Sequence, residues 1–144
     1  MGGFGRGMLT PFGEPETKAF VKATLSEVHA LELALRRLST PVRVAVLHYA
    51  PISATIAGEP EAIHPYLGTD RLAEPLDRYS AAVAFHGHAH SGTRARCAVR
   101  RSGEYRLFNV SLPLLRKERP GAMYYIYDVN VPAVADAQKT ISLR

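Results

Sequence analysis

Histidine is the residue type in this chain best able to do chemistry, and four of its six histidines directly follow apolar segments. His48 comes after the apolar run at residues 42–47, and His86, His88 and His90 come after the run at residues 81–85. Neutral imidazole is a common protein ligand for zinc, iron and manganese-type ions, and imidazoles at the ends of adjacent strands can converge on one cation. His48, His88 and His90 meet this requirement and are candidate metal ligands.

The loop after residue 85 brings its histidines close together along the chain. In extended backbone His88 and His90 point to the same side, and we expect Gly87 and Gly92 to free the turn around an ion. Metal sites commonly contain groups that orient a ligand imidazole through a hydrogen bond, and we expect a buried His86, together with Asn109, in this role. A His-x-His pair is generic by itself. His29 and His64 belong to no such cluster, and we interpret them as ordinary histidines.

One long helix is the clearest element that could support this loop. Residues 16–38 contain no glycine or proline, and apolar residues recur there at steps of three and four, which predicts an amphipathic helix. The preceding residues 1–14 are rich in glycine and predict a loop or linker.

The remaining elements are predicted to be mainly strands. Residues 42–47 are too apolar for an exposed edge and predict a buried strand, and residues 81–85 predict a second strand. Prolines and glycines break residues 49–79 into a long loop, with room for a short helix near residues 70–76. Strand-like segments follow at 95–100, 105–110, 123–129 and 140–143, with a hairpin turn at Ser102-Gly103 and breaks at Pro113 and Pro132.

Composition limits the class of protein. The 144 residues suit a single domain, and the lone Cys97 excludes an internal disulfide framework and a thiolate metal cage. No run of eighteen apolar residues and no signal peptide is readable, so we expect a cytoplasmic protein that does not enter a membrane. The net charge of +5 is scattered without interleaved aromatic residues, and we do not expect nucleic acid as a partner.

The histidine motifs resemble those of a known family. Val-Ala-Val-Leu-His-Tyr-Ala-Pro at residues 44–51, followed by Phe-His-Gly-His-Ala-His at residues 85–90, resembles the last two motifs of calcineurin-like metallophosphoesterases. Phe-Asn-Val-Ser at residues 108–111 resembles the strand that follows in that family. The resemblance implies that His48 and His88 bind one divalent cation of a two-metal site, and that His90 binds the other. Manganese, iron or zinc ions about 3.5–4 Å apart would then promote hydrolysis of a phosphomonoester or phosphodiester substrate.

The same resemblance implies a fold and an incomplete site. The fold would be α/β (α+β), with mixed sheets and flanking helices as part of a four-layer αββα sandwich. Residues 1–144 would form its C-terminal half as a single domain. The family's earlier Asp-x-His, Gly-Asp and Gly-Asn-His motifs do not occur in this chain. Without their bridging carboxylate, two close cations repel each other strongly.

We therefore expect a truncated or split hydrolase half that is inactive without an N-terminal half. Its uncovered strand edges favour a homo-oligomer. The main alternative is a non-catalytic metal-binding or interaction domain that retains the histidines as relics. A nucleic-acid binder also stays open, as does a complete mononuclear hydrolase. The latter requires His48, His88 and His90 all within about 2.0–2.1 Å of one ion.

Overall fold

The computed structural model of the chain describes residues 15–100 and 103–131. The glycine-rich segment 1–14, Ser102 of the expected hairpin turn and the strand expected at 140–143 lie outside these residues. Within them the helices are α1 (Pro15–Arg37), α2 (His64–Leu67), α3 (Ala73–Arg78) and α4 (Leu112–Glu118), with short 3-10 helices at Ser53–Thr55, Glu61–Ile63 and Asp70–Leu72. The strands are β1 (Val44–Val46), β2 (Val83–His86), β3 (Ala95–Arg100) and β4 (Gly103–Asn109).

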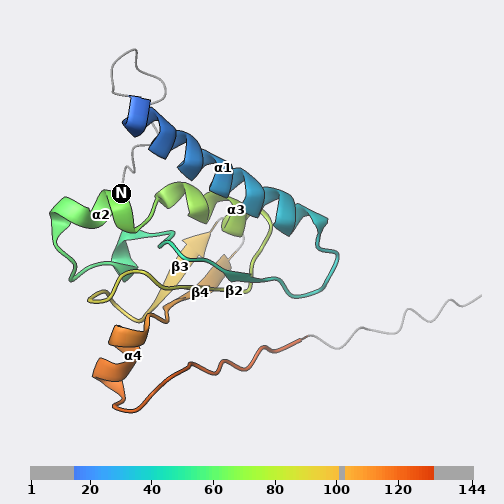
Figure 1. Ribbon diagram of the computed structural model, residues 1–144. Coiled ribbons are helices and arrows are strands. Elements are labelled where there is room, and N and C mark those ends of the chain that lie inside the picture. Colours follow the sequence, from blue (N-terminus) through green and yellow to red (C-terminus); the bar gives the residue numbers. More distant parts are fainter. Residues whose placement is uncertain (1–14, 101–102, 132–144) are drawn as a thin grey trace, which may run out of the picture.

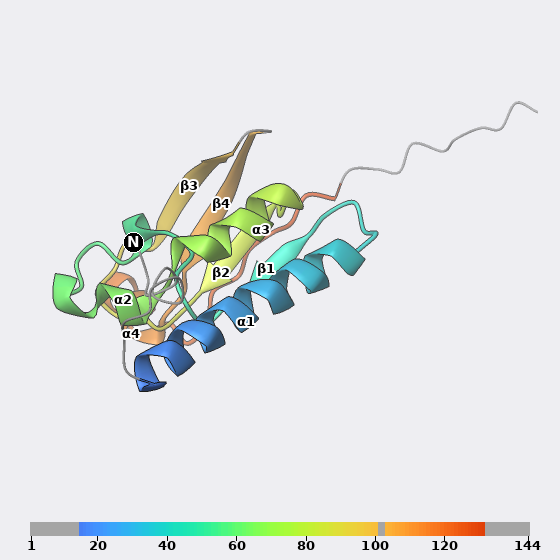
Figure 2. The same cartoon turned by 90° about the horizontal axis from the view of Figure 1, so that it is seen from above.

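The four strands form one mixed sheet in the order β1-β2-β4-β3. β1, β2 and β4 are parallel neighbours, and β3 runs antiparallel to β4. Helices α1 and α3 cover one face of the sheet, while α4 and the segment after it lie on the other side (Figures 1 and 2). The fold is therefore mixed α/β and corresponds to part of a layered α/β sandwich, as the sequence predicted.

The main core lies between the sheet and the two helices. Alternate strand residues face the helices, and in register these are Ala45, Ala84 and Leu107. They pack with Leu35 of α1 and Leu76 of α3. The small alanines let the helices approach the sheet closely. The helix expected over residues 16–38 is present as α1, because its apolar stripe has this surface to cover.

The opposite face of the sheet carries an aromatic cluster. Phe85 of β2 and Phe108 of β4 stack with ring centroids 5.6 Å apart. Tyr125 and Tyr127 pack on both rings, at centroid distances between 5.3 and 6.3 Å. The strand expected at residues 123–129 is wrong, since these residues form no strand in the structure. Alternating aromatic residues fit a strand pattern, but here they pack on the face of a sheet.

Two further predictions about the elements are corrected. β1 is an edge strand rather than a buried one, because it comes first in the strand order, and only Ala45 is buried while Val44 is 40% and Val46 79% exposed. Composition could not reveal which side of this strand lacks a neighbour. Pro113 follows the end of β4, as a break between strands should, but helix α4 was not predicted: Pro113 lies in its first turn, where its missing N–H has no helical partner to lose. The short helix expected near residues 70–76 is confirmed by the 3-10 helix at Asp70–Leu72 and by α3.

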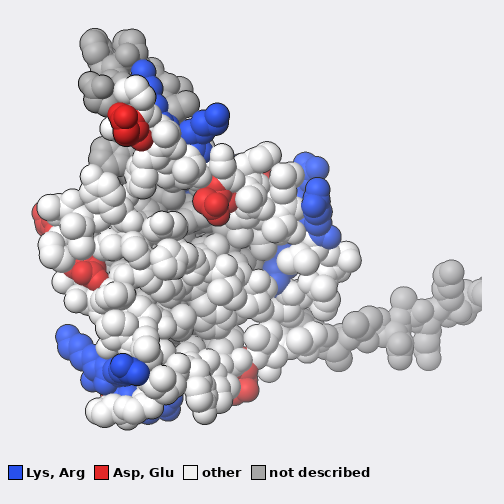
Figure 3. Space-filling model, in the orientation of Figure 1, with Lys and Arg blue, Asp and Glu red and all other residues white. Residues whose placement is uncertain are grey.

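Charged residues are dispersed over the surface. Figure 3 shows a largely uncharged central face, with basic side chains near α4 and near the C-terminal end of α1. Arg36 and Arg37 lie in the last turn of α1, and Arg116 and Lys117 lie in the last turn of α4. In the part of the chain that the structure describes, no helix combines the length and apolarity needed to span a membrane.

Candidate metal centre

The carboxyl ends of β1 and β2 bring the predicted histidines together. The backbone pairing continues past β1, because Leu47 N–H donates to Phe85 O at 2.8 Å and Gly87 N–H donates to His48 O at 3.2 Å. Asn109 lies at the end of β4, in register with His86. In open α/β sheets, ligands bind outside the carboxyl ends of parallel strands, and this cluster lies there.

His48 and His88 face each other across the two loops. His48 Nε2 lies 3.1 Å from His88 Nδ1, and the ring centroids are 4.6 Å apart. Two nitrogens bound to one tetrahedral zinc ion at 2.0–2.1 Å lie about 3.3 Å from each other. The observed separation therefore fits a pair of imidazoles that share one cation. When no cation is bound, the same separation permits a hydrogen bond between the rings.

His90 does not complete a three-ligand cluster. Its side chain is exposed. Among residues 15–100 and 103–131, no group of three histidine, cysteine or acidic side chains is placed to hold one metal ion. A mononuclear site made of His48, His88 and His90 is therefore not formed by this arrangement. The role of His90 at a second metal stays a prediction.

The loop around His88 is a tight turn rather than extended backbone. Ala89 N–H donates to Gly87 O at 2.7 Å, and His88 between them has φ +63°. A residue other than glycine in this left-handed region is uncommon and costs free energy, and such residues cluster at functional sites. A turn was expected here, but the left-handed residue is His88 itself rather than a glycine.

Beneath the turn lies a buried polar group made by His86 and Thr55. Both are fully buried, His86 Nε2 lies 2.8 Å from Thr55 Oγ1, and His86 Nδ1 lies 3.0 Å from Gly87 O. Burial lowers the pKa of His86, so the ring is neutral and carries one proton. Because the Gly87 carbonyl can only accept, that proton is on Nδ1. The Thr55 hydroxyl has one proton, for which His86 Nε2 at 2.8 Å and Ile52 O at 3.1 Å compete as acceptors.

Asn109 holds the backbone of the same turn. Its Nδ2 donates to Ala89 O at 2.8 Å and to Thr55 O at 3.3 Å, and its Oδ1 accepts from Ser111 N–H at 3.1 Å. Ser111 Oγ also donates to Ala89 O, at 2.7 Å. His86 and Asn109 are thus bonded to the loop that carries the ligands. That either of them orients a ligand ring stays a prediction.

Several contributors to this site had no signal in the sequence. Burial and the nearby His48 lower the pKa of His88, and a hydrogen bond with the Tyr66 backbone partly opposes them. Glu59 accepts a hydrogen bond from Ser91 N–H at 2.6 Å, and its charge also acts to raise the pKa of His88. Tyr49 makes edge contacts with both rings, at centroid distances of 4.9 Å to His48 and 5.1 Å to His88. Apart from Tyr49, which follows His48, these residues come from the long loop, where spacing is uninformative.

The other two histidines lie apart from the pair. His29 is exposed on α1, and His64 Nε2 bonds with Glu59 O at 3.0 Å. That neither has a role at the site stays a prediction.

Comparison with known proteins gives one structural likeness. No protein-family model matches the chain, and no curated protein matches it. Among solved structures, the phosphopantetheinyl hydrolase PptH from Mycobacterium tuberculosis is similar, with 22% sequence identity and a TM-score of 0.47. The match covers 76% of this chain and 38% of that protein. The chain thus spans well under half of the length of this structural neighbour.

Proposed function

We propose that this chain supplies the histidine side of a metal-dependent phosphoesterase site. The observation that carries the proposal is the 3.1 Å approach of His48 Nε2 to His88 Nδ1 at the ends of two parallel strands. The order of the motifs at residues 44–51 and 85–90, which resembles that of calcineurin-like metallophosphoesterases, supports the same reading.

In this proposal His48 and His88 hold one divalent cation, and His90 is a ligand of a second. Manganese, iron and zinc suit nitrogen ligands of this type, and when bound they supply Lewis-acid polarisation of a phosphoryl oxygen. The chain itself orients the imidazole rings of His48 and His88 toward the position of the cation. Tyr66 orients His88 through its backbone, and the turn at residues 87–89 aims the ring at His48.

The proposed site needs further ligands. Two divalent cations close together require carboxylates between them, and the described residues place no acidic side chain in a three-ligand cluster. We therefore propose that the chain hydrolyses phosphate esters only together with a segment that supplies carboxylate and amide ligands.

Metal binding is the first test. Isothermal titration of Mn²⁺ and Zn²⁺ into the purified chain should show binding that His48→Gln and His88→Gln each weaken by about tenfold or more. His29→Gln, an exposed change on α1, is the matched control and should leave the affinity unchanged. Equal affinity in all three variants would contradict the proposed site. His90→Gln should affect only a second, weaker binding event.

Activity is the second test. Hydrolysis of 4-nitrophenyl phosphate and bis(4-nitrophenyl) phosphate is measured with Mn²⁺, for the chain alone and for the chain co-expressed with a segment carrying Asp-x-His, Gly-Asp and Gly-Asn-His motifs. We expect turnover only in the second case, and its loss in His48→Gln. Stoichiometric metal with no turnover in either case would favour the alternative, a metal-binding domain without catalysis.

A further inference from the structure

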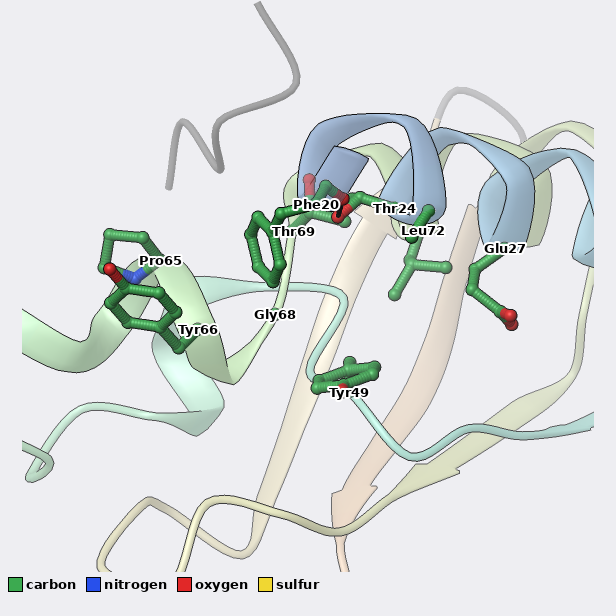
Figure 4. Close-up of a pocket in the computed structure, with 10 residues that line it drawn as sticks. Phe20, Thr24, Glu27, Tyr49, Pro65, Tyr66, Gly68, Thr69 and Leu72 are labelled. Carbon is green, nitrogen blue, oxygen red and sulfur yellow. Dashed lines mark hydrogen bonds between the residues drawn. The ribbon is translucent and has the colours of Figure 1, made fainter. Parts of the chain in front are cut away.

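A pocket of 260 Å³ opens beside the histidine pair, between α1 and the loop at residues 65–72. Three aromatic rings line it: Phe20 from α1, Tyr49 from the loop after β1, and Tyr66 from α2 (Figure 4). Leu72, Ala23 and Pro65 add apolar surface, and Thr24, Thr69 and Glu27 add polar groups. The pocket thus combines stacking surfaces with a few polar atoms, as small-molecule sites do.

Two residues of this pocket also contact the histidine pair. The ring of Tyr49 lies with its centroid 4.9 Å from that of His48 and 5.1 Å from that of His88. Tyr66 lines the pocket and holds His88 by a backbone hydrogen bond. Because Tyr49 borders both, the pocket lies within one aromatic ring of the place where a phosphate at the pair would be held.

We propose that this pocket binds a flat aromatic group of the phosphoester substrate. The inference rests on the proposed function and names its substrate class: aryl or heteroaryl phosphate esters. The pocket volume limits the size of the bound group, because an apolar cavity of about 150 Å³ holds benzene, whereas pockets for drug-sized ligands measure about 300–1,000 Å³. The 260 Å³ here fit one ring or a small fused ring system. Phe20 and Tyr66, whose centroids are 5.8 Å apart, provide the aromatic contacts.

The polar groups restrict the charge of that ring. Glu27 lines the pocket and is exposed, so its carboxylate disfavours a second anionic group on the ligand and favours an N–H donor. Thr24 Oγ1 donates to Phe20 O at 3.0 Å, so toward a ligand its oxygen can only accept. These groups select an uncharged ring, with or without N–H groups, over a ring that bears a carboxylate.

The test compares ligands that share the anionic head and differ in the organic group. Phenylphosphonate and methylphosphonate are titrated into the Zn²⁺-loaded full chain by calorimetry, with phenol as a probe that lacks the phosphoryl group. We expect phenylphosphonate to bind about tenfold more tightly than methylphosphonate, equivalent to about 1.4 kcal/mol. Phe20→Ala should reduce this preference to less than about threefold and leave methylphosphonate binding unchanged.

Control variants separate the pocket from the fold. Leu38→Ala removes an apolar side chain whose exposure, 40%, matches the 38% of Phe20, and it lies outside the pocket, so the preference should persist. Ala23→Phe fills the pocket from an exposed helix position and should remove the preference without unfolding the chain.

The outcomes keep the two proposals apart. Equal affinities for phenylphosphonate and methylphosphonate, or a preference that survives both Phe20→Ala and Ala23→Phe, overturn the pocket assignment while phosphate binding stands. If neither phosphonate binds but phenol binds and is lost in both variants, the phosphoesterase proposal fails and the aromatic pocket stands.

Discussion

Replacement of Gly92 by alanine tests whether the histidine loop needs this glycine for close packing or only for backbone freedom. A Cβ at residue 92 would lie 2.0 Å from Thr55 O and 3.0 Å from Asn109 Nδ2. Ordinary contact begins at 3.4 Å, so the carbonyl or the loop must move by about 1.4 Å, the difference between 3.4 and 2.0 Å. The matched control is Gly87→Ala in the same loop, where a Cβ would meet nothing within 4 Å.

The size of the effect follows from the hydrogen bonds at Thr55. Its carbonyl accepts from Thr93 N–H at 3.1 Å and from Asn109 Nδ2 at 3.3 Å, and a shift of this size breaks both. A buried donor left without a partner costs about 1–3 kcal/mol, and Asn109 keeps its second bond, to Ala89 O. Reduced freedom of the unfolded chain returns about 0.4–1 kcal/mol. The difference of these two ranges is centred between about 1 and about 2 kcal/mol, so we expect Gly92→Ala to lower the free energy of unfolding by about 1–2 kcal/mol, and Gly87→Ala to leave it unchanged or to raise it by less than about 1 kcal/mol.

Urea unfolding measured by circular dichroism gives both free energies, provided that the slopes of the transitions agree. The same variants should differ in Zn²⁺ affinity, with a loss of about tenfold or more in Gly92→Ala only, because the loop carries His88. If Gly92→Ala were as stable as Gly87→Ala, the packing of this loop against Thr55 would be refuted.

Three further predictions concern the buried polar group and the edge strand. Burial lowers the pKa of His86 below its ordinary 6.5, so below that pH the unfolded state binds more protons than the folded state. The metal-free chain should therefore keep its stability above pH 7 and lose it as the pH falls from about 6.5 through the folded pKa. Urea midpoints of His86→Gln should vary less over the same range. Asn109→Ala should lower the free energy of unfolding by about 2–4 kcal/mol, whereas the exposed control Asn130→Ala should lower it by less than about 0.5 kcal/mol. Similar values for the two variants would contradict the role of Asn109 in holding the turn. Val46 is 79% exposed on the edge strand, so Val46→Lys should change the free energy of unfolding by no more than about 0.5 kcal/mol and decrease self-association measured by light scattering. Unchanged self-association would exclude this edge as the contact between copies.

Local patterns in the sequence were sufficient for the elements whose stability depends on near neighbours along the chain. The apolar stripe of residues 16–38 predicted α1, and the short apolar runs before His48 and His86 predicted β1 and β2. Because histidine follows both runs, their pairing as parallel neighbours placed His48 and the loop that carries His88 at the same edge of the sheet. The motif order thus anticipated the proximity of this pair.

Contacts between distant residues decided the rest. Ala45 is buried and Val46 is 79% exposed on the same edge strand, so the exposure of Val46 depends on what covers its face of the sheet, which residue types do not reveal. Asn109 holds the left-handed turn at His88 by hydrogen bonds to Ala89 O and Thr55 O. These acceptors lie 20 and 54 residues before Asn109 in the sequence. Among the described residues, His90 forms no three-ligand group with the pair, although its spacing from His88 permitted one. Residue types determined what could bind a metal, but only the packed loop determined which rings meet, because a hydrogen bond between distant segments leaves no periodic signal in sequence.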